Sequence, residues 1–243
     1  MWISEHAAEL KKKNKTLLDD LAEIYAKYGY CHNYLTEIRL LGAKGMEQIM
    51  SIMNHLRDRK IDSFGEFTVS GKNDRRDGEP QPHLSRTDSS ARNMLLYQID
   101  NRPGTTSMRV TVRPSGTEPK IKMYFEVFGK PFKLENIDSE KEKVINIREA
   151  LEKNFMQYCY KLLNVDFPNR GFLLFWQLPL DDKLKYFAIE NQISDLKSIS
   201  DNDERKKELF KLLEFLGANP IEKVNKAFKE KHQAGILDYL ELS

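Results

Sequence analysis

Residues 110–127 read VTVRPSGTEPKIKMYFEV, and this stretch decides the fold that the sequence predicts. Apolar and polar side chains alternate over 110–112 and again over 121–127, which is the period-2 pattern of half-buried strands. The eight residues between these runs, 113–120, include no large apolar side chain. We therefore expect two strands joined by a polar loop.

The segments before this stretch predict further strands and a helix. Strands are expected over residues 34–41, 64–69 and 94–99. A turn is expected over 42–45, and methionine, isoleucine and leucine residues then recur at helical spacing over 46–56. At this spacing the methionines indicate a core stripe rather than a binding surface.

A second long helix follows the loop. Ser139 and Glu142 have the spacing of a capping box, and apolar residues then repeat at helical spacing over 144–162. The polar residues 71–93 predict a long surface loop or a partly disordered segment. The order of strand, helix, several strands and helix favours an α+β fold, with a mainly antiparallel sheet and helices on one face.

The two ends of the chain are predicted to be helical. Thr16 and Asp19 resemble a capping box at the start of an apolar helical pattern. Residues 165–243 follow a plausible hinge and read as a small helical appendage. A helix is expected to begin at Asn219-Pro220, because proline is favoured in the first helical turn.

The composition is that of an ordinary globular protein. The chain has 243 residues and a net charge of +2, so its overall field favours neither a nucleic-acid nor a membrane partner. Cys31 and Cys159 lack metal-binding spacing, and neither a signal sequence nor a run of 18 apolar residues is apparent. We expect a cytoplasmic setting. The apolar residues 172–180 are expected to pack on the domain or across a dimer.

The loop has the donors that a phosphate dianion needs. Arg113 offers a planar fork of N–H groups, Ser115 and Thr117 offer hydroxyls, and Lys120 adds a point charge. Gly116 permits a backbone geometry in which successive N–H groups surround an anion. From the residues alone, ordinary turn chemistry with solvated lysines is an equal alternative.

The sequence RPSGTEPK, residues 113–120, resembles the phosphate-binding loop in the last domain of the α-D-phosphohexomutase superfamily. This superfamily includes the phosphoglucomutases and phosphomannomutases. Residues 15–30 resemble the helix that closes the third domain of these enzymes. The resemblance implies three parts: the end of the third domain over 1–32, a C-terminal domain over 33–164 with a fold like that of the TATA-binding protein, and a helical appendage over 165–243.

The resemblance also implies a function. The parent enzyme would move a phosphoryl group between the C1 and C6 hydroxyls of a hexose phosphate, through an enzyme phosphoserine and a bisphosphate intermediate. Arg113, Ser115, Gly116, Thr117 and Lys120 would bind the phosphate that does not react. The phosphoserine, magnesium and sugar-selecting loops of the family are absent from this sequence. The resemblance implies that the full-length parent uses Mg2+, bound at a site outside this chain. We therefore expect no catalytic residue, no metal site, no bound cofactor and no activity in this chain alone.

Other functions stay open. A phosphopentomutase-like enzyme of the same superfamily is one alternative, and a non-catalytic module that binds anions, nucleic acid or a protein is another. The balanced charge argues against nucleic acid. The expected partners are a sugar phosphate and the remaining mutase domains, with a possible homodimer through the tail.

Overall fold

The computed structural model describes residues 2–76, 92–116, 118–166, 168, 170–173 and 178–242. The chain divides into two compact units. The first contains Met1–Leu35, Lys60–Val112 and Met123–Phe155, and the second contains Thr36–Arg59, Arg113–Lys122 and Met156–Ser243.

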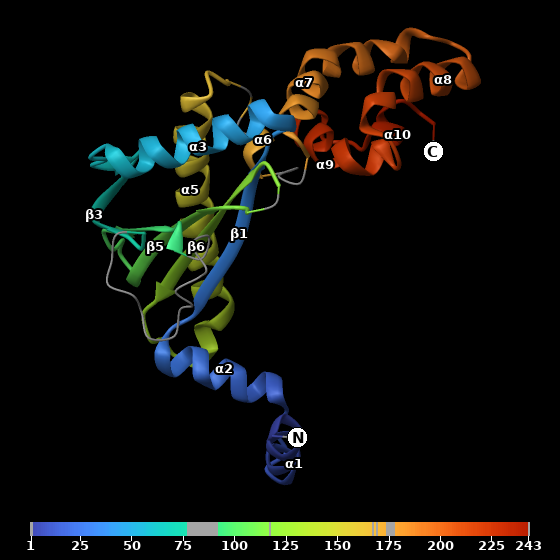
Figure 1. Cartoon of the computed structure of the whole chain (residues 1–243). Helices are drawn as coiled ribbons and strands as arrows, with labels where there is room; N and C mark the ends of the chain where they lie inside the picture. The colour runs from blue at the N-terminus through green and yellow to red at the C-terminus, as the bar shows by residue number, and fades with distance from the viewer. Residues whose placement is uncertain are drawn as a thin grey trace. The chain divides into compact units, whose positions relative to one another are not determined.

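The elements follow the predicted order of a strand, a helix, several strands and a second long helix (Figure 1). The strands are β1 Cys31–Arg39, β2 Ser63–Phe64, β3 Phe67–Asp74, β4 Leu95–Ile99, β5 Thr105–Pro114 and β6 Lys120–Gly129. The helices are α1 Trp2–Lys12, α2 Leu17–Tyr28, α3 Gly42–Asp58, α5 Ile137–Leu162, α6 Arg170–Leu173, α7 Leu180–Asp195, α8 Asn202–Leu212, α9 Pro220–His232 and α10 Ile236–Tyr239.

The strands form one six-stranded sheet in the order β1-β6-β5-β4-β3-β2. Antiparallel pairing joins β2 to β3, β3 to β4 and β4 to β5. The first strand lies beside β6, where the N–H of Gly129 donates to the carbonyl of Tyr30 at 2.8 Å. Gly29 precedes this contact with a φ of +92°, and a Cβ on it would lie 2.1 Å from the Gly129 oxygen. The fold is therefore α+β, an antiparallel sheet packed with helices, as predicted.

The core of the first unit is aromatic. The ring of Phe155 lies 4.5 Å from that of Phe64 and 5.8 Å from that of Phe125. Tyr97 packs edge-on against Phe64 at 5.1 Å. All four residues are buried, so the sheet and the α5 helix share one apolar interior.

Four local predictions were wrong. The loop expected over 71–93 starts too early, because β3 continues to Asp74, and residues 77–91 lie outside the described residues. Residues 42–45 begin the α3 helix instead of forming a separate turn. The expected strand over 64–69 is two strands, because the chain reverses at Gly65 with a φ of +59°. Ser139 lies inside the α5 helix and donates to the carbonyl of Asn136 at 3.0 Å, so it is not the N-cap.

The capping of α2 agrees with the prediction. The Thr16 side chain accepts a hydrogen bond from the N–H of Asp19 at 3.2 Å, and the N–H of Thr16 donates to the Asp19 carboxylate at 2.8 Å. This carboxylate has a lowered pKa, because the backbone and the hydroxyl of Thr16 hydrogen-bond to its charged form. The start of α2 is thus set by two residues of local sequence.

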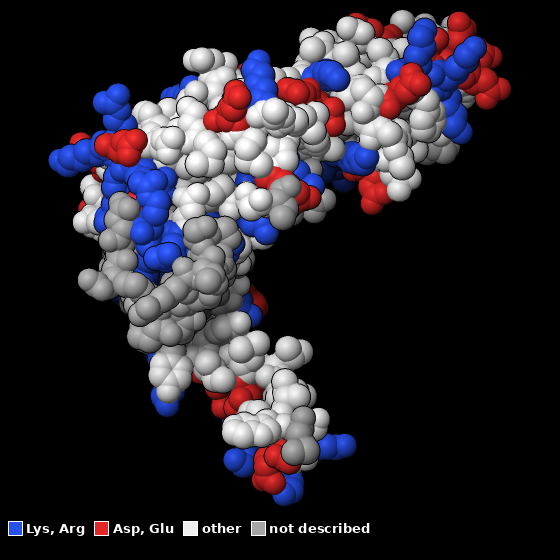
Figure 2. Space-filling view, in the orientation of Figure 1, with Lys and Arg blue, Asp and Glu red and all other residues white. Residues whose placement is uncertain are grey.

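The tail is helical, as predicted, and has its own apolar cluster. Its core includes Tyr186, Leu213 and Phe228, and Pro220 begins the α9 helix. Leu178 and Leu180 are buried, whereas the side chains of 172–177 lie outside the described residues. Figure 2 shows acidic and basic side chains interspersed over the helical tail. Within the described part of the chain, no helix is long and apolar enough to cross a membrane.

Candidate functional site: the loop between β5 and β6

The loop motif 113–120 includes the last two residues of β5, the connecting residues 115–119 and the first residue of β6, and backbone hydrogen bonds close it. The N–H of Ser115 donates to the carbonyl of Lys120 at 2.8 Å. The N–H of Lys120 donates to the carbonyl of Glu118 at 2.7 Å. From the end of β1, the N–H of Leu40 donates to the carbonyl of Pro119 at 2.9 Å. Thr117 lies outside the described residues. The two ends of the loop are therefore fixed, and the N–H of Ser115 is already engaged.

The guanidinium of Arg113 has N–H donors available for a ligand of the loop. This residue is half-buried, and the described residues form no ion pair or hydrogen bond with its guanidinium. Ser115 is also half-buried and follows Arg113 by two residues, whereas Gly116 is exposed. An arginine in this state can offer two parallel N–H groups to an oxyanion.

Lys120 is engaged with carboxylates. Its ammonium forms an ion pair with Glu118 and lies 3.9 Å from an oxygen of Glu37. The hydrogen bond from Lys120 lowers the pKa of Glu118. The other oxygen of Glu37 accepts a hydrogen bond from the Nε of Arg39. Lys120 therefore shares its charge with carboxylates, which leaves Arg113 better placed to bind a ligand.

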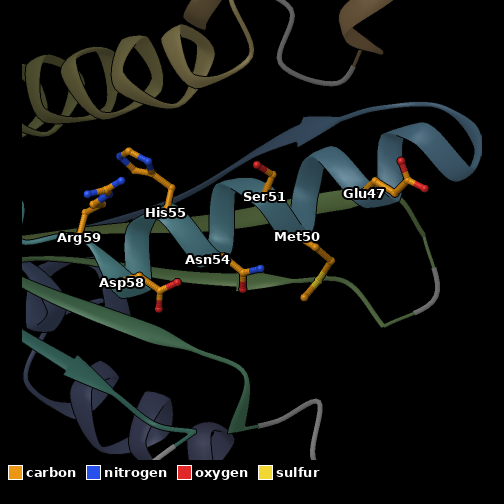
Figure 3. A pocket seen from close by; sticks show the side chains of 7 residues that line it. All are labelled: Glu47, Met50, Ser51, Asn54, His55, Asp58 and Arg59. Carbon is orange, nitrogen blue, oxygen red and sulfur yellow. The ribbon is translucent and has the colours of Figure 1, made fainter.

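A second surface feature lies along the α3 helix. An open hollow with a volume of about 700 Å³ is lined by Glu47, Met50, Ser51, Asn54, His55, Asp58 and Arg59. Figure 3 shows these side chains spaced along α3 and just beyond its end. The Nε2 of His55 lies 2.9 Å from the hydroxyl of Tyr158, whose pKa is raised by burial. Two carboxylates and one guanidinium line the hollow, a charge balance that disfavours a phosphate dianion.

A bound metal ion has no evident place in the described part of the chain. No group of three or more His, Cys, Asp or Glu side chains there is arranged to hold one.

The fold and the loop define an α+β domain with an arginine-bearing hairpin loop. Residues 98–144, which include this loop, match the family described as phosphoglucomutase/phosphomannomutase, C-terminal domain. The chain is 34% identical over 149 residues to a phosphoglucomutase of Staphylococcus aureus strain MSSA476, covering 58% of this chain and 24% of that protein. It is 35% identical over 127 residues to that of strain N315, covering 50% and 22%.

The chain is thus homologous to phosphoglucomutase over about half of its length, with the C-terminal domain of that family as the matched part. It spans about a quarter of the length of these relatives. The contributions of Glu37 and Arg39 to the loop region did not follow from the sequence. They depend on the pairing of β1 with β6, between residues about 80 positions apart, and no local pattern encodes that pairing.

Proposed function

We propose that residues 113–120 bind the phosphate of a sugar phosphate, as the C-terminal part of a phosphoglucomutase or phosphomannomutase. The observation that carries this proposal is the half-buried guanidinium of Arg113, without a described partner, in a loop within the matched family region. The hydroxyl groups of Ser115 and Thr117 and N–H groups around Gly116 complete the donor set. Lys120 adds charge while Glu118 holds its ammonium.

In this proposal the complete enzyme moves a phosphoryl group between the C1 and C6 hydroxyls of a hexose phosphate, using a phosphoserine outside this chain. The loop binds the phosphate that is not reacting. Its hydrogen bonds position the sugar hydroxyl, and this binding energy lowers the barrier of the chemical step. Magnesium supplies charge stabilisation at the transferred group in such chemistry, and in this proposal it is bound outside this chain.

An exposed apolar face on α2 supports a partner in the remaining mutase domains. None of the residues of α2 is buried. Four apolar residues recur at helical spacing along one face of α2, and their exposed fractions are 37% for Leu17, 40% for Leu21, 44% for Ile24 and 66% for Tyr28. An amphipathic helix of a folded protein normally buries its apolar face. We propose that 1–32 is the end of a preceding domain, 33–164 the C-terminal domain and 165–243 an appended helical part.

An NMR titration tests the proposed site. Glucose 6-phosphate is expected to shift the amide resonances of Ser115, Gly116 and Thr117 in the purified chain. Glucose at the same concentrations should leave them unchanged, because the sugar lacks the anion. Binding is expected to be weak, since the loop forms only one wall of a cleft. Shifts confined to α3, or none at all, would rule out this assignment.

The chain alone is expected to show no mutase activity with glucose 1-phosphate or mannose 1-phosphate. The reason is that the phosphoserine, magnesium and sugar-selecting loops of the family are missing from the sequence. A coupled assay of the purified chain, with a complete phosphoglucomutase as positive control, measures this. Turnover that persists through further purification and scales with the concentration of the chain would refute the prediction.

A further inference from the structure

We propose that Arg39 supplies a second guanidinium to the phosphate bound at residues 113–120, positioned by the buried carboxylate of Glu37. This inference deepens the proposed function of the loop and rests on it. Arg39 is the last residue of β1 and lies outside the loop in the sequence. Neither its spacing nor its neighbours in the sequence connect it with residues 113–120.

The backbone places Arg39 beside the closed end of the loop. The next residue, Leu40, donates its N–H to the carbonyl of Pro119 at 2.9 Å. Arg39 also lies close enough to Glu118 for its charge to lower the pKa of that carboxyl, after the larger effects of Lys120. The end of β1 and the end of the loop are therefore immediate neighbours.

The Arg39 side chain has donors left for a ligand. It donates to Glu37 through Nε, and the described contacts give its two terminal NH2 groups no partner. The side chain is 42% exposed, so an anion in solvent can reach it. A guanidinium has five N–H donors, of which the Glu37 contact uses one.

Glu37 fixes the position of Arg39. The residue Glu37 is only 3% exposed, and a buried charge needs partners. One of its oxygens accepts from Arg39, and the other lies 3.9 Å from the ammonium of Lys120. Lys120 is further neutralised by Glu118. The cations best able to face a dianion are therefore the guanidinium groups of Arg113 and Arg39, which match phosphate with two donors each.

The test is a titration of inorganic phosphate into the full chain at fixed ionic strength, followed by NMR. Arg39→Ala is expected to weaken binding roughly tenfold, the usual effect of losing one charge-assisted hydrogen bond. Arg39→Gln should weaken phosphate binding as much as Arg39→Ala, although it keeps an N–H donor for Glu37. Arg39→Lys should weaken phosphate binding less, because it keeps the positive charge. Lys226→Ala removes an exposed cation of the α9 helix and should have no effect.

The outcomes separate this inference from the proposed function. If Arg113→Ala weakens binding but Arg39→Gln leaves the dissociation constant unchanged, the role of Arg39 is wrong and the loop assignment survives. If the wild-type chain binds no phosphate at the loop, both are overturned. If Arg39→Ala does not fold, the phosphate affinities of Arg39→Gln and Arg39→Lys test the role of Arg39 instead, because both side chains can still contact Glu37. If Lys226→Ala weakened phosphate binding as much as Arg39→Ala does, the effect would come from the general charge of the chain, and the inference would be contradicted.

Discussion

Glu190→Gln is expected to destabilise the helical tail by about 3 kcal/mol, the lower end of the usual cost of breaking a buried ion pair. Glu190, in the α7 helix, is 3% exposed. Its carboxylate accepts hydrogen bonds from Arg170 at 2.5 Å, from the Tyr186 hydroxyl at 2.9 Å and from Lys231 at 3.1 Å. The glutamine side chain is neutral, so Arg170 and Lys231 would lose the negative charge that they contact.

The predicted loss depends on pH. Burial alone would raise the pKa of Glu190, but hydrogen bonds from Arg170, Tyr186 and Lys231 outweigh it and lower the pKa. A carboxylate with a lowered folded-state pKa stabilises the fold above its ordinary pKa, and this stabilisation is lost as the pH falls through the lowered value. The difference between wild type and Glu190→Gln should therefore be full at neutral pH and narrow in strong acid.

Urea unfolding followed by circular dichroism, with hydrogen exchange over residues 178–242, measures this effect. Glu230→Gln is the matched control, because Glu230 is an exposed glutamate of the α9 helix. Equal midpoints for Glu190→Gln and the control at neutral pH would show that the ion pairs contribute little. A difference that grew on acidification would contradict the predicted direction of the pKa shift.

Arg113→Ala is expected to weaken phosphate binding roughly tenfold to a hundredfold, because a hydrogen bond to a charged group contributes about 1.5–3 kcal/mol. The fold should survive the change, since the described residues form no ion pair with Arg113. The effect should be larger than that of removing Lys120, whose ammonium is paired with Glu118. Inorganic phosphate titrated at fixed ionic strength gives the affinities of both variants.

Thermal unfolding of Arg113→Ala provides the control for folding, and Lys226→Ala provides the control for general charge. The same midpoint and the same shifts at Ser115 and Gly116 in wild type and Arg113→Ala would mean that the loop is ordinary turn chemistry. A loss of the same size in Lys226→Ala would attribute the effect to long-range charge alone.

The sequence predicted the fold where the pattern was local. The alternation over 121–127 became β6, and the Thr16 capping box marks the start of α2. Both signals come from residues that interact within one element or one turn. One error arose because the backbone before the α5 helix departs from the capping pattern. Ser139 fits a capping box, yet the α5 helix begins at Ile137, after a single 3-10 turn.

The candidate site was predicted only in part, because some of its residues come together through long-range strand pairing. Arg113 and Ser115 lie two positions apart in the sequence, and the loop motif alone indicated them. Glu37 and Arg39 reach the same region because β1 pairs with β6, a long-range pairing that strand periodicity does not specify. The ion pair between Lys120 and Glu118 also depends on the closed loop, although the sequence placed the two residues two positions apart.

A crystal structure of the chain with glucose 6-phosphate would test the central claim most directly. We predict electron density for the phosphate at residues 113–120, with one oxygen about 3 Å from the Arg113 guanidinium and another near the Ser115 hydroxyl. Phosphate density in the hollow along α3, with the loop empty at a saturating concentration of the sugar phosphate, would contradict it.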